Sequence, residues 1–204
     1  MPILLKLIIA LTLTIPSEVE SLPEEAFRDR TDLTEVRFSP GSRLRELPVG
    51  TFRGCSNLRR VDLPDSLVRI GAHAFAYCSC LDSIRFPATL RRVGNNAFSR
   101  CISLSEVSLP DSVTMLESYA FSDCTSLRSA RLPANDSLLG ELIFSGCESL
   151  VELIEPSPVP PRFDCDSFIF EPEETAMYRR CRLSVPTEAS AAYSRSPAWS
   201  LFNR

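Results

Sequence analysis

Cysteine is the residue type whose number and spacing in this sequence first suggest chemistry. Five of the eight cysteines lie 23 residues apart, at Cys55, Cys78, Cys101, Cys124 and Cys147. A column of thiols could ligate a soft metal or form disulfides. However, neighbouring Cβ atoms in stacked parallel strands lie about 4.8 Å apart, whereas a disulfide needs about 3.8 Å. We therefore expect these cysteines to act as small buried apolar residues.

The other three cysteines, Cys80, Cys165 and Cys181, lie outside this period. Cys78 and Cys80 are separated by one residue and do not form the C-x-x-C motif of redox proteins. The sequence leaves open a disulfide between Cys165 and Cys181.

Other catalytic chemistry finds little support in the sequence. His73 is the only histidine, and we expect it in a solvated loop. The sequence contains no G-x-S-x-G, phosphate-binding glycine loop or H-E-x-x-H. A net charge of −4 and a pI near 5.2 argue against nucleic-acid binding. We therefore predict a protein without enzymatic activity, metal or cofactor; the glycosylation pattern at Asn135 matters only in a secreted chain.

The 23-residue period extends to other residue types. Phenylalanine recurs at Phe52, Phe75, Phe98, Phe121 and Phe144. Leucine recurs at Leu58, Leu81, Leu104, Leu127 and Leu150, and proline at Pro64, Pro87, Pro110, Pro133 and Pro156. A fixed repeat of this length predicts a solenoid, in which each coil is one unit that stacks on the next.

Each repeat contains one clear strand signal. In "LRRVDLP" (58–64) apolar and polar residues alternate, which indicates a half-buried strand. Pro64 ends it, and a second apolar set that includes Ile70 and Phe75 must fold back against it. A coil this short cannot bury both sets alone, so we expect columns of identical side chains along the stack.

These segments resemble the BspA-like leucine-rich repeat family, in its 23-residue class. The similar segments are "LRRVDLPDSLVRIGAHAFAYC" (58–78), "LDSIRFPATLRRVGNNAFSRC" (81–101), "LSEVSLPDSVTMLESYAFSDC" (104–124) and "LRSARLPANDSLLGELIFSGC" (127–147). The resemblance implies a leucine-rich-repeat solenoid, a right-handed β-α/β superhelix of mostly short parallel strands with few helices, and a C-terminal cap with a short helix. It also implies secreted or cell-surface adhesion roles, although a column of free thiols also suits the cytoplasm.

The chain divides into three predicted segments. Residues 13–154 hold about six coils, and residues 155–204 form a transition and C-terminal cap. Residues 1–12 are either an N-terminal cap or a signal-like segment, and Lys6 makes them a poor membrane span. In the C-terminal cap, we expect Thr187 to cap a helix that Pro197 ends, with Ala189, Tyr193 and Trp199 buried.

The residues beside the central apolar residue of each strand point outward and vary, as expected of a displayed surface. On the predicted concave face they are Glu35, Arg37, Arg60, Asp62, Ser83, Arg85, Glu106, Ser108, Ser129, Arg131 and Glu152. Cross-strand ion pairs are expected for Glu35–Arg60, Arg37–Asp62 and Asp62–Arg85.

These side chains predict a binding module for a protein or glycan partner, of the adhesion or recognition type. The alternative is a structural unit, a fragment of a longer repeat array, that stacks end to end or self-associates through its N-terminal edge, where several apolar residues precede Thr12.

Overall fold

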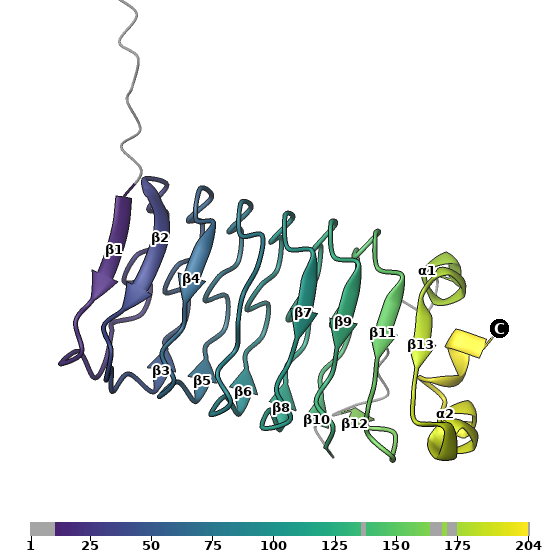
Figure 1. Ribbon diagram of the computed structural model, residues 1–204. Helices are drawn as coiled ribbons and strands as arrows, with labels where there is room; N and C mark the ends of the chain where they lie inside the picture. The colour runs from purple at the N-terminus through teal and green to yellow at the C-terminus, as the bar shows by residue number, and fades with distance from the viewer. Residues whose placement is uncertain (1–10, 136–137, 164–168, 171–174, 204) are drawn as a thin grey trace, which may run out of the picture.

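Short parallel strands and turns repeat along the chain and stack into a rod of about seven turns (Figure 1). The computed structural model describes residues 11–135, 138–163, 169–170 and 175–203. The predicted solenoid is confirmed, and its first strand, β1 (Leu11–Ile15), begins before the expected start at Leu13. Residues 1–10, on which the two interpretations of the N-terminus depend, lie outside the described residues.

One long face of the rod, here called the front face, carries seven parallel strands. They form two sheets, β1-β2-β4 and β7-β9-β11-β13, and the coil between β4 and β7 contributes no strand to this face. After β1, these strands are β2 (Leu33–Phe38), β4 (Arg60–Asp62), β7 (Glu106–Ser108), β9 (Ser129–Arg131), β11 (Glu152–Ile154) and β13 (Arg182–Ser184). The central residue of each strand from β4 to β11 is buried, and its two neighbours point outward.

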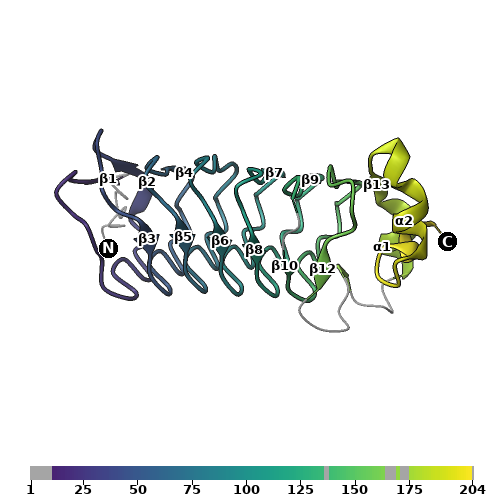
Figure 2. The same ribbon diagram turned by 90° about the horizontal axis from the view of Figure 1, so that it is seen from below.

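A third sheet, of six strands, runs along the rod below the front face and continues without a break (Figure 2). Its strands are β3 (Glu46–Leu47), β5 (Arg69–Ile70), β6 (Arg92–Val93), β8 (Met115–Leu116), β10 (Leu138–Leu139) and β12 (Arg162–Phe163). Neighbouring strands pair in parallel, with Ile70 beside Val93 and Val93 beside Leu116. The buried residues of this sheet, such as Ile70 and Val93, belong to the second apolar set of each repeat. As predicted, the chain folds back so that this set packs against the buried residues of the front face.

The remaining side of each coil, here called the turn face, is built from tight turns with two left-handed residues. In one coil these are His73 and Tyr77, with φ of 56° and 64°. The amide of Phe75, between them, donates to the carbonyl of Ala97 in the next coil at 2.8 Å, whereas that of Ala76 donates to His73 at 3.1 Å. Alternate amides thus bond within the coil or to the next coil, so a backbone without regular secondary structure can be buried.

Phenylalanine and cysteine form the continuous core. The rings of Phe27, Phe52, Phe75, Phe98, Phe121 and Phe144 stack with centroids 5.1–5.7 Å apart. The repeating cysteines are buried free thiols beside this stack. Each thiol donates to the carbonyl of a phenylalanine in the preceding coil, as from Cys78 to Phe52 at 3.2 Å. The position therefore holds cysteine for its weak hydrogen bond as well as its small size.

Polar side chains link the coils just after the repeating proline. Ser66, Thr89 and Ser112 each donate a hydroxyl hydrogen bond, 2.7 Å long, to a carbonyl in the preceding coil. Asn135 continues the ladder, because its amide donates to Val113 at 2.8 Å and to Asp111 at 2.5 Å. The candidate glycosylation amide is thus a structural donor.

Aromatic residues close the C-terminal end of the rod. The cap contains α1 (Thr175–Arg180), a 3-10 turn η1 (Thr187–Ala189), α2 (Ser190–Arg195) and a second 3-10 turn η2 (Ser200–Asn203). Tyr193 and Trp199 are buried edge to face, 5.5 Å apart. The prediction that Thr187 caps the helix is wrong: the cap residue of η1 is Pro186, which makes no side-chain bond. None of the described helices is long and apolar enough to cross a membrane.

Candidate binding site on the front face

Charged side chains near the two ends of the front face are paired within the protein. Arg37 binds Glu35 on its own strand at 2.9 Å. At the other end Arg131 binds Asp111 at 3.0 Å, and Arg182 binds Glu152. Glu35 and Arg60 are register neighbours, as are Arg37 and Asp62, but the predicted cross-strand ion pairs do not form among the described residues. The same-strand pair of Glu35 and Arg37 takes their place.

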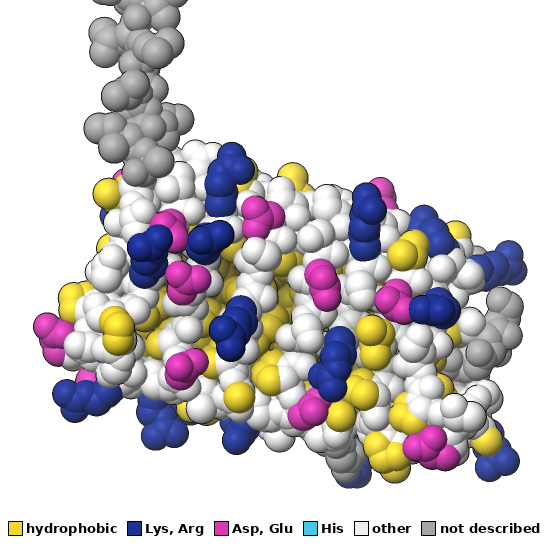
Figure 3. All heavy atoms as spheres, viewed as in Figure 1, with side chains coloured by type: hydrophobic (Ala, Val, Ile, Leu, Met, Phe, Trp, Pro, Cys, Tyr) yellow, Lys and Arg dark blue, Asp and Glu magenta, His cyan; other side chains and the backbone are white. Residues whose placement is uncertain are grey.

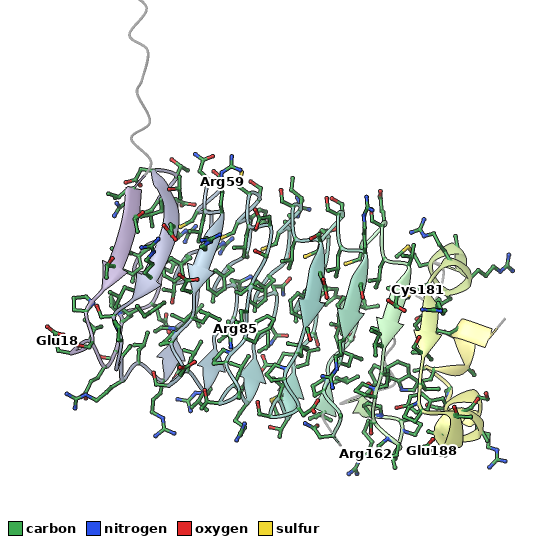
Figure 4. The ribbon with its side chains drawn as sticks, viewed as in Figure 1. Glu18, Arg59, Arg85, Arg162, Cys181 and Glu188 are labelled. Atoms are coloured by element: carbon green, nitrogen blue, oxygen red, sulfur yellow. The ribbon has the colours of Figure 1, made fainter. Side chains whose placement is uncertain are left out.

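The middle of the front face carries charges without such partners. Arg60, Asp62, Arg85 and Glu106 are exposed, and within the described part of the chain none of them forms an ion pair. Figure 4 shows Arg85 near the middle of this face, pointing away from the ribbon. A partner can therefore bind these charges without breaking an internal ion pair. Substituting them should also cost the fold little, because exposed charges contribute little to stability.

The sheet of the front face is interrupted at Ser83, Ile84 and Arg85. Among the described residues, the backbone groups of 83–86 form no hydrogen bond to a neighbouring coil. In this coil Phe86 occupies the position that holds Leu63, Leu109 and Leu132 in three other coils and Phe38 at the end of β2. Its ring is nearly buried and meets Phe98 edge to face at 5.6 Å. Phe86 is thus buried, whereas Phe38 at the equivalent position is only partly buried and ends an intact strand.

A groove lies at this interruption, and we call it the front groove. Its cavity has a volume of about 440 Å³. The lining residues are Asp62, Leu63, Asp65, Arg85, Phe86, Pro87, Ala88 and Pro110. Figure 3 shows apolar side chains exposed between charged ones in the middle of this face. An apolar floor with a few charged groups at its rim is typical of sites that bind another molecule.

The predicted surface residues therefore do not form one uniform site. Arg60, Asp62, Ser83, Arg85, Glu106 and Ser108 are exposed around the interruption, whereas Glu35, Ser129, Arg131 and Glu152 are half-buried nearer the ends. Sequence reasoning missed the groove and the role of Phe86. The nearest signal is a phenylalanine at a position that three other coils fill with leucine, although Phe38 also occupies it in an intact strand.

The repeating cysteines and His73 are poorly suited to nucleophilic catalysis or metal binding. Burial raises the pKa of the Cys55 thiol to about 11 and holds that of Cys101 well above its usual value, so both stay protonated. His73 lies half-buried in a left-handed turn, not in a solvated loop, and burial followed by the charge of Arg53 lowers its pKa. No group of three metal-ligating side chains occurs in the part of the chain that the structure describes.

The proposed disulfide in the cap involves a residue that the structure does not describe. Cys165 lies outside the described residues, so the pairing with Cys181 does as well. Cys181 itself is a buried free thiol, and burial raises its pKa to about 12.

Comparison with known proteins identifies the fold. Residues 9–79 and 45–161 match the BspA type leucine rich repeat region, with six copies. The crystal structure of a leucine-rich repeat protein from T. pallidum is 38% identical, with a TM-score of 0.67, and the match covers 76% of this chain and 73% of that one. None of the curated proteins compared with the chain matches it.

Two further solved structures are more distant. A leucine-rich repeat protein from Bacteroides ovatus is 20% identical with a TM-score of 0.38, and the match covers 86% of this chain and 60% of that one. A leucine rich cell surface protein from Faecalibacterium prausnitzii is 17% identical with a TM-score of 0.34, over 89% and 81% of the two chains. Both are too dissimilar to bear on function. The 23-residue period, the phenylalanine stack and the matching repeat region together show that the chain belongs to the BspA-type leucine-rich repeat family.

Proposed function

We propose that this chain is a non-enzymatic binding module, of the recognition or adhesion type, which presents the front face to a protein partner. The observation that supports this most directly is the front groove, where an apolar floor of Leu63, Pro87 and Pro110 adjoins the charges of Asp62 and Arg85. Arg60 lies outside this lining, on the same strand as Asp62, and is also exposed. Stable protein interfaces combine such an apolar centre with a polar rim.

The distribution of ion pairs favours the middle of the face over its ends. Arg37 and Arg131 each have a carboxylate partner already, and a new partner would have to displace it. Arg60 and Arg85 have no such partner among the described residues. Binding through these two arginines therefore requires no internal pair to break, and opposite charges on the partner would speed its approach.

Charge reversal at the groove tests this proposal against a matched control. A photo-crosslinking amino acid at Ser108 captures the partner from extracts of the source cells or their surroundings. We expect the captured band to disappear when Arg60→Glu and Arg85→Glu are combined, and to remain with Arg37→Glu. Equal capture by the double variant and the control would show that the partner does not bind at the front groove.

A second candidate function, end-to-end assembly, rests on the N-terminal edge of the front face. β1 ends the β1-β2-β4 sheet, with Leu11 38% exposed and Leu13 only partly buried. Among the described residues no strand pairs with the outer edge of β1, and such an edge offers backbone groups to another chain. Light scattering after size-exclusion chromatography tests this role, because self-association through β1 predicts a dimer that Thr12→Pro and Thr14→Pro abolish. A monomer at all concentrations would contradict it.

A further inference from the structure

Tyr77 stands out on the turn face, on a different side of each coil from the front groove. It has a φ of 64° and remains 44% exposed. The equivalent left-handed positions in other coils hold Asp29, Gly54, Arg100, Asp123 and Gly146. Glycine adopts this conformation without strain, whereas a bulky aromatic residue rarely does. Tyr119 also has a left-handed φ, of 58°, but it is half-buried, so Tyr77 differs by presenting its ring to solvent.

Two arginines lie against the Tyr77 ring. The guanidinium carbon of Arg53 is 5.9 Å from the ring centroid, and that of Arg100 is 5.5 Å away. Gly54 precedes Tyr77 in the column, and the carboxylate of Asp29 lies where a side chain at Gly54 would be. The contacts of the two arginines with the ring hold the cations in place while their N–H groups stay available, because the ring face interacts with the charge.

These N–H groups have few acceptors within the protein. Arg100 makes one contact with a carboxylate, from Nε to Asp123 Oδ2 at 3.4 Å. In the part of the chain that the structure describes, neither the Arg53 guanidinium nor the Tyr77 hydroxyl has a hydrogen-bond partner. Asp123 is already held by Arg100, so it does not supply the missing acceptors. In the free protein these donors are exposed to water, and a partner's acceptors can replace that water without breaking a bond of Arg53 or Tyr77 within the described protein.

We propose that Tyr77, Arg53 and Arg100 form a second binding surface, which takes an acidic segment of a partner protein. Carboxylates accept two parallel hydrogen bonds from a guanidinium, and the tyrosine ring adds apolar contact area. Tyrosine and arginine are also the residue types that dominate the energy of protein interfaces. The net charge of the chain is −4, so an acidic segment would be attracted by this local cluster and not by the protein as a whole.

Fluorescence anisotropy with a labelled oligoglutamate peptide tests the surface on the full chain. We expect binding at low ionic strength that weakens with added salt. Combining Arg53→Gln with Arg100→Gln should weaken oligoglutamate binding by at least about tenfold. Arg128→Gln, which removes an exposed arginine elsewhere on the rod, is the matched control and should bind as the wild type does. Equal affinity of the double variant and this control would overturn the proposal.

Tyr77→Gly separates a binding role from a structural one. We expect weaker oligoglutamate binding together with an unchanged or raised denaturant midpoint, because glycine relieves the left-handed strain. A lowered midpoint would show that the ring serves to hold the coils together, and the proposal would fail. A heparin fragment provides the last comparison: if it bound through Arg53 and Arg100 while oligoglutamate did not, the partner would be a sulfated glycan and not an acidic protein segment.

Discussion

Glu155 directly follows β11, where the repeats meet the C-terminal cap, and its titration should govern the stability of that junction. Its side chain is fully buried. Oε1 accepts a hydrogen bond from the backbone N–H of Ser157 at 2.9 Å, whereas Oε2 has no partner among the described residues. Burial raises the pKa of Glu155 to about 8 from its usual 4.5, against the opposing effects of the Ser157 N–H and the charge of Arg131.

The raised pKa fixes the sign of the pH dependence. Below pH 4.5 the carboxyl is protonated in both the folded and unfolded chain, so folding is unaffected. Between pH 4.5 and about 8 the unfolded chain ionises while the folded chain stays protonated, and stability falls by about 1.4 kcal/mol per pH unit. The loss reaches roughly 3 kcal/mol at pH 7 and is complete above the folded pKa.

Glu155→Gln removes this titration and should abolish the corresponding loss. Urea unfolding at a series of pH values measures it, and fluorescence of the single tryptophan, Trp199, reports on the cap directly. We expect the variant to gain stability over the wild type as the pH rises from 5 to 8, and little difference below pH 4.5.

Glu188→Gln is a matched control, because Glu188 is exposed on the cap. It should keep the wild-type pH profile. Parallel profiles for wild type and Glu155→Gln would refute the assignment of a raised pKa to this buried carboxyl.

Three further predictions concern the core and the interruption of the sheet. Phe98→Ala should lower the unfolding free energy by about 3–5 kcal/mol, because Phe98 stacks on two phenylalanines and meets Phe86; an unmoved urea midpoint would contradict the continuous stack. Phe86→Leu should let residues 83–86 rejoin the sheet, seen as slower amide hydrogen exchange there, and unchanged exchange would mean that Phe86 does not cause the interruption. Cys101 should react with a thiol reagent only after unfolding, because burial raises its pKa; mass spectrometry of the native protein checks this, and rapid labelling would show that the thiol column is accessible.

Much of the fold could be predicted from the sequence because the repeat is periodic. Phe98 and Cys101 recur at one interval with their counterparts, and stacking at strand spacing places identical residues in contact. The left-handed turns were harder to foresee. The column that includes Tyr77 holds residues of several types, since neighbouring coils and backbone hydrogen bonds stabilise a conformation that local preference disfavours.

The candidate binding site was only partly predictable. Alternation within each strand identified outward residues such as Arg60 and Arg85, but not their partners. Glu35 lies beside Arg60 in register yet binds Arg37, because long side chains on a surface have several partners within reach. The front groove depends on how the larger Phe86 packs against Phe98, which no pattern of polar and apolar residues specifies.

The sequence by itself determined the solenoid, the length of its coil and the columns of its core. These follow from one physical requirement, since a short coil can bury its apolar side chains only against neighbours of the same kind. The tertiary structure decided where the front sheet is interrupted, which charges stay unpaired and why Tyr77 lies between two arginines. Those features depend on how side chains from neighbouring coils pack and which rotamers they adopt. The repeat does not specify these, because the residues involved differ from one coil to the next.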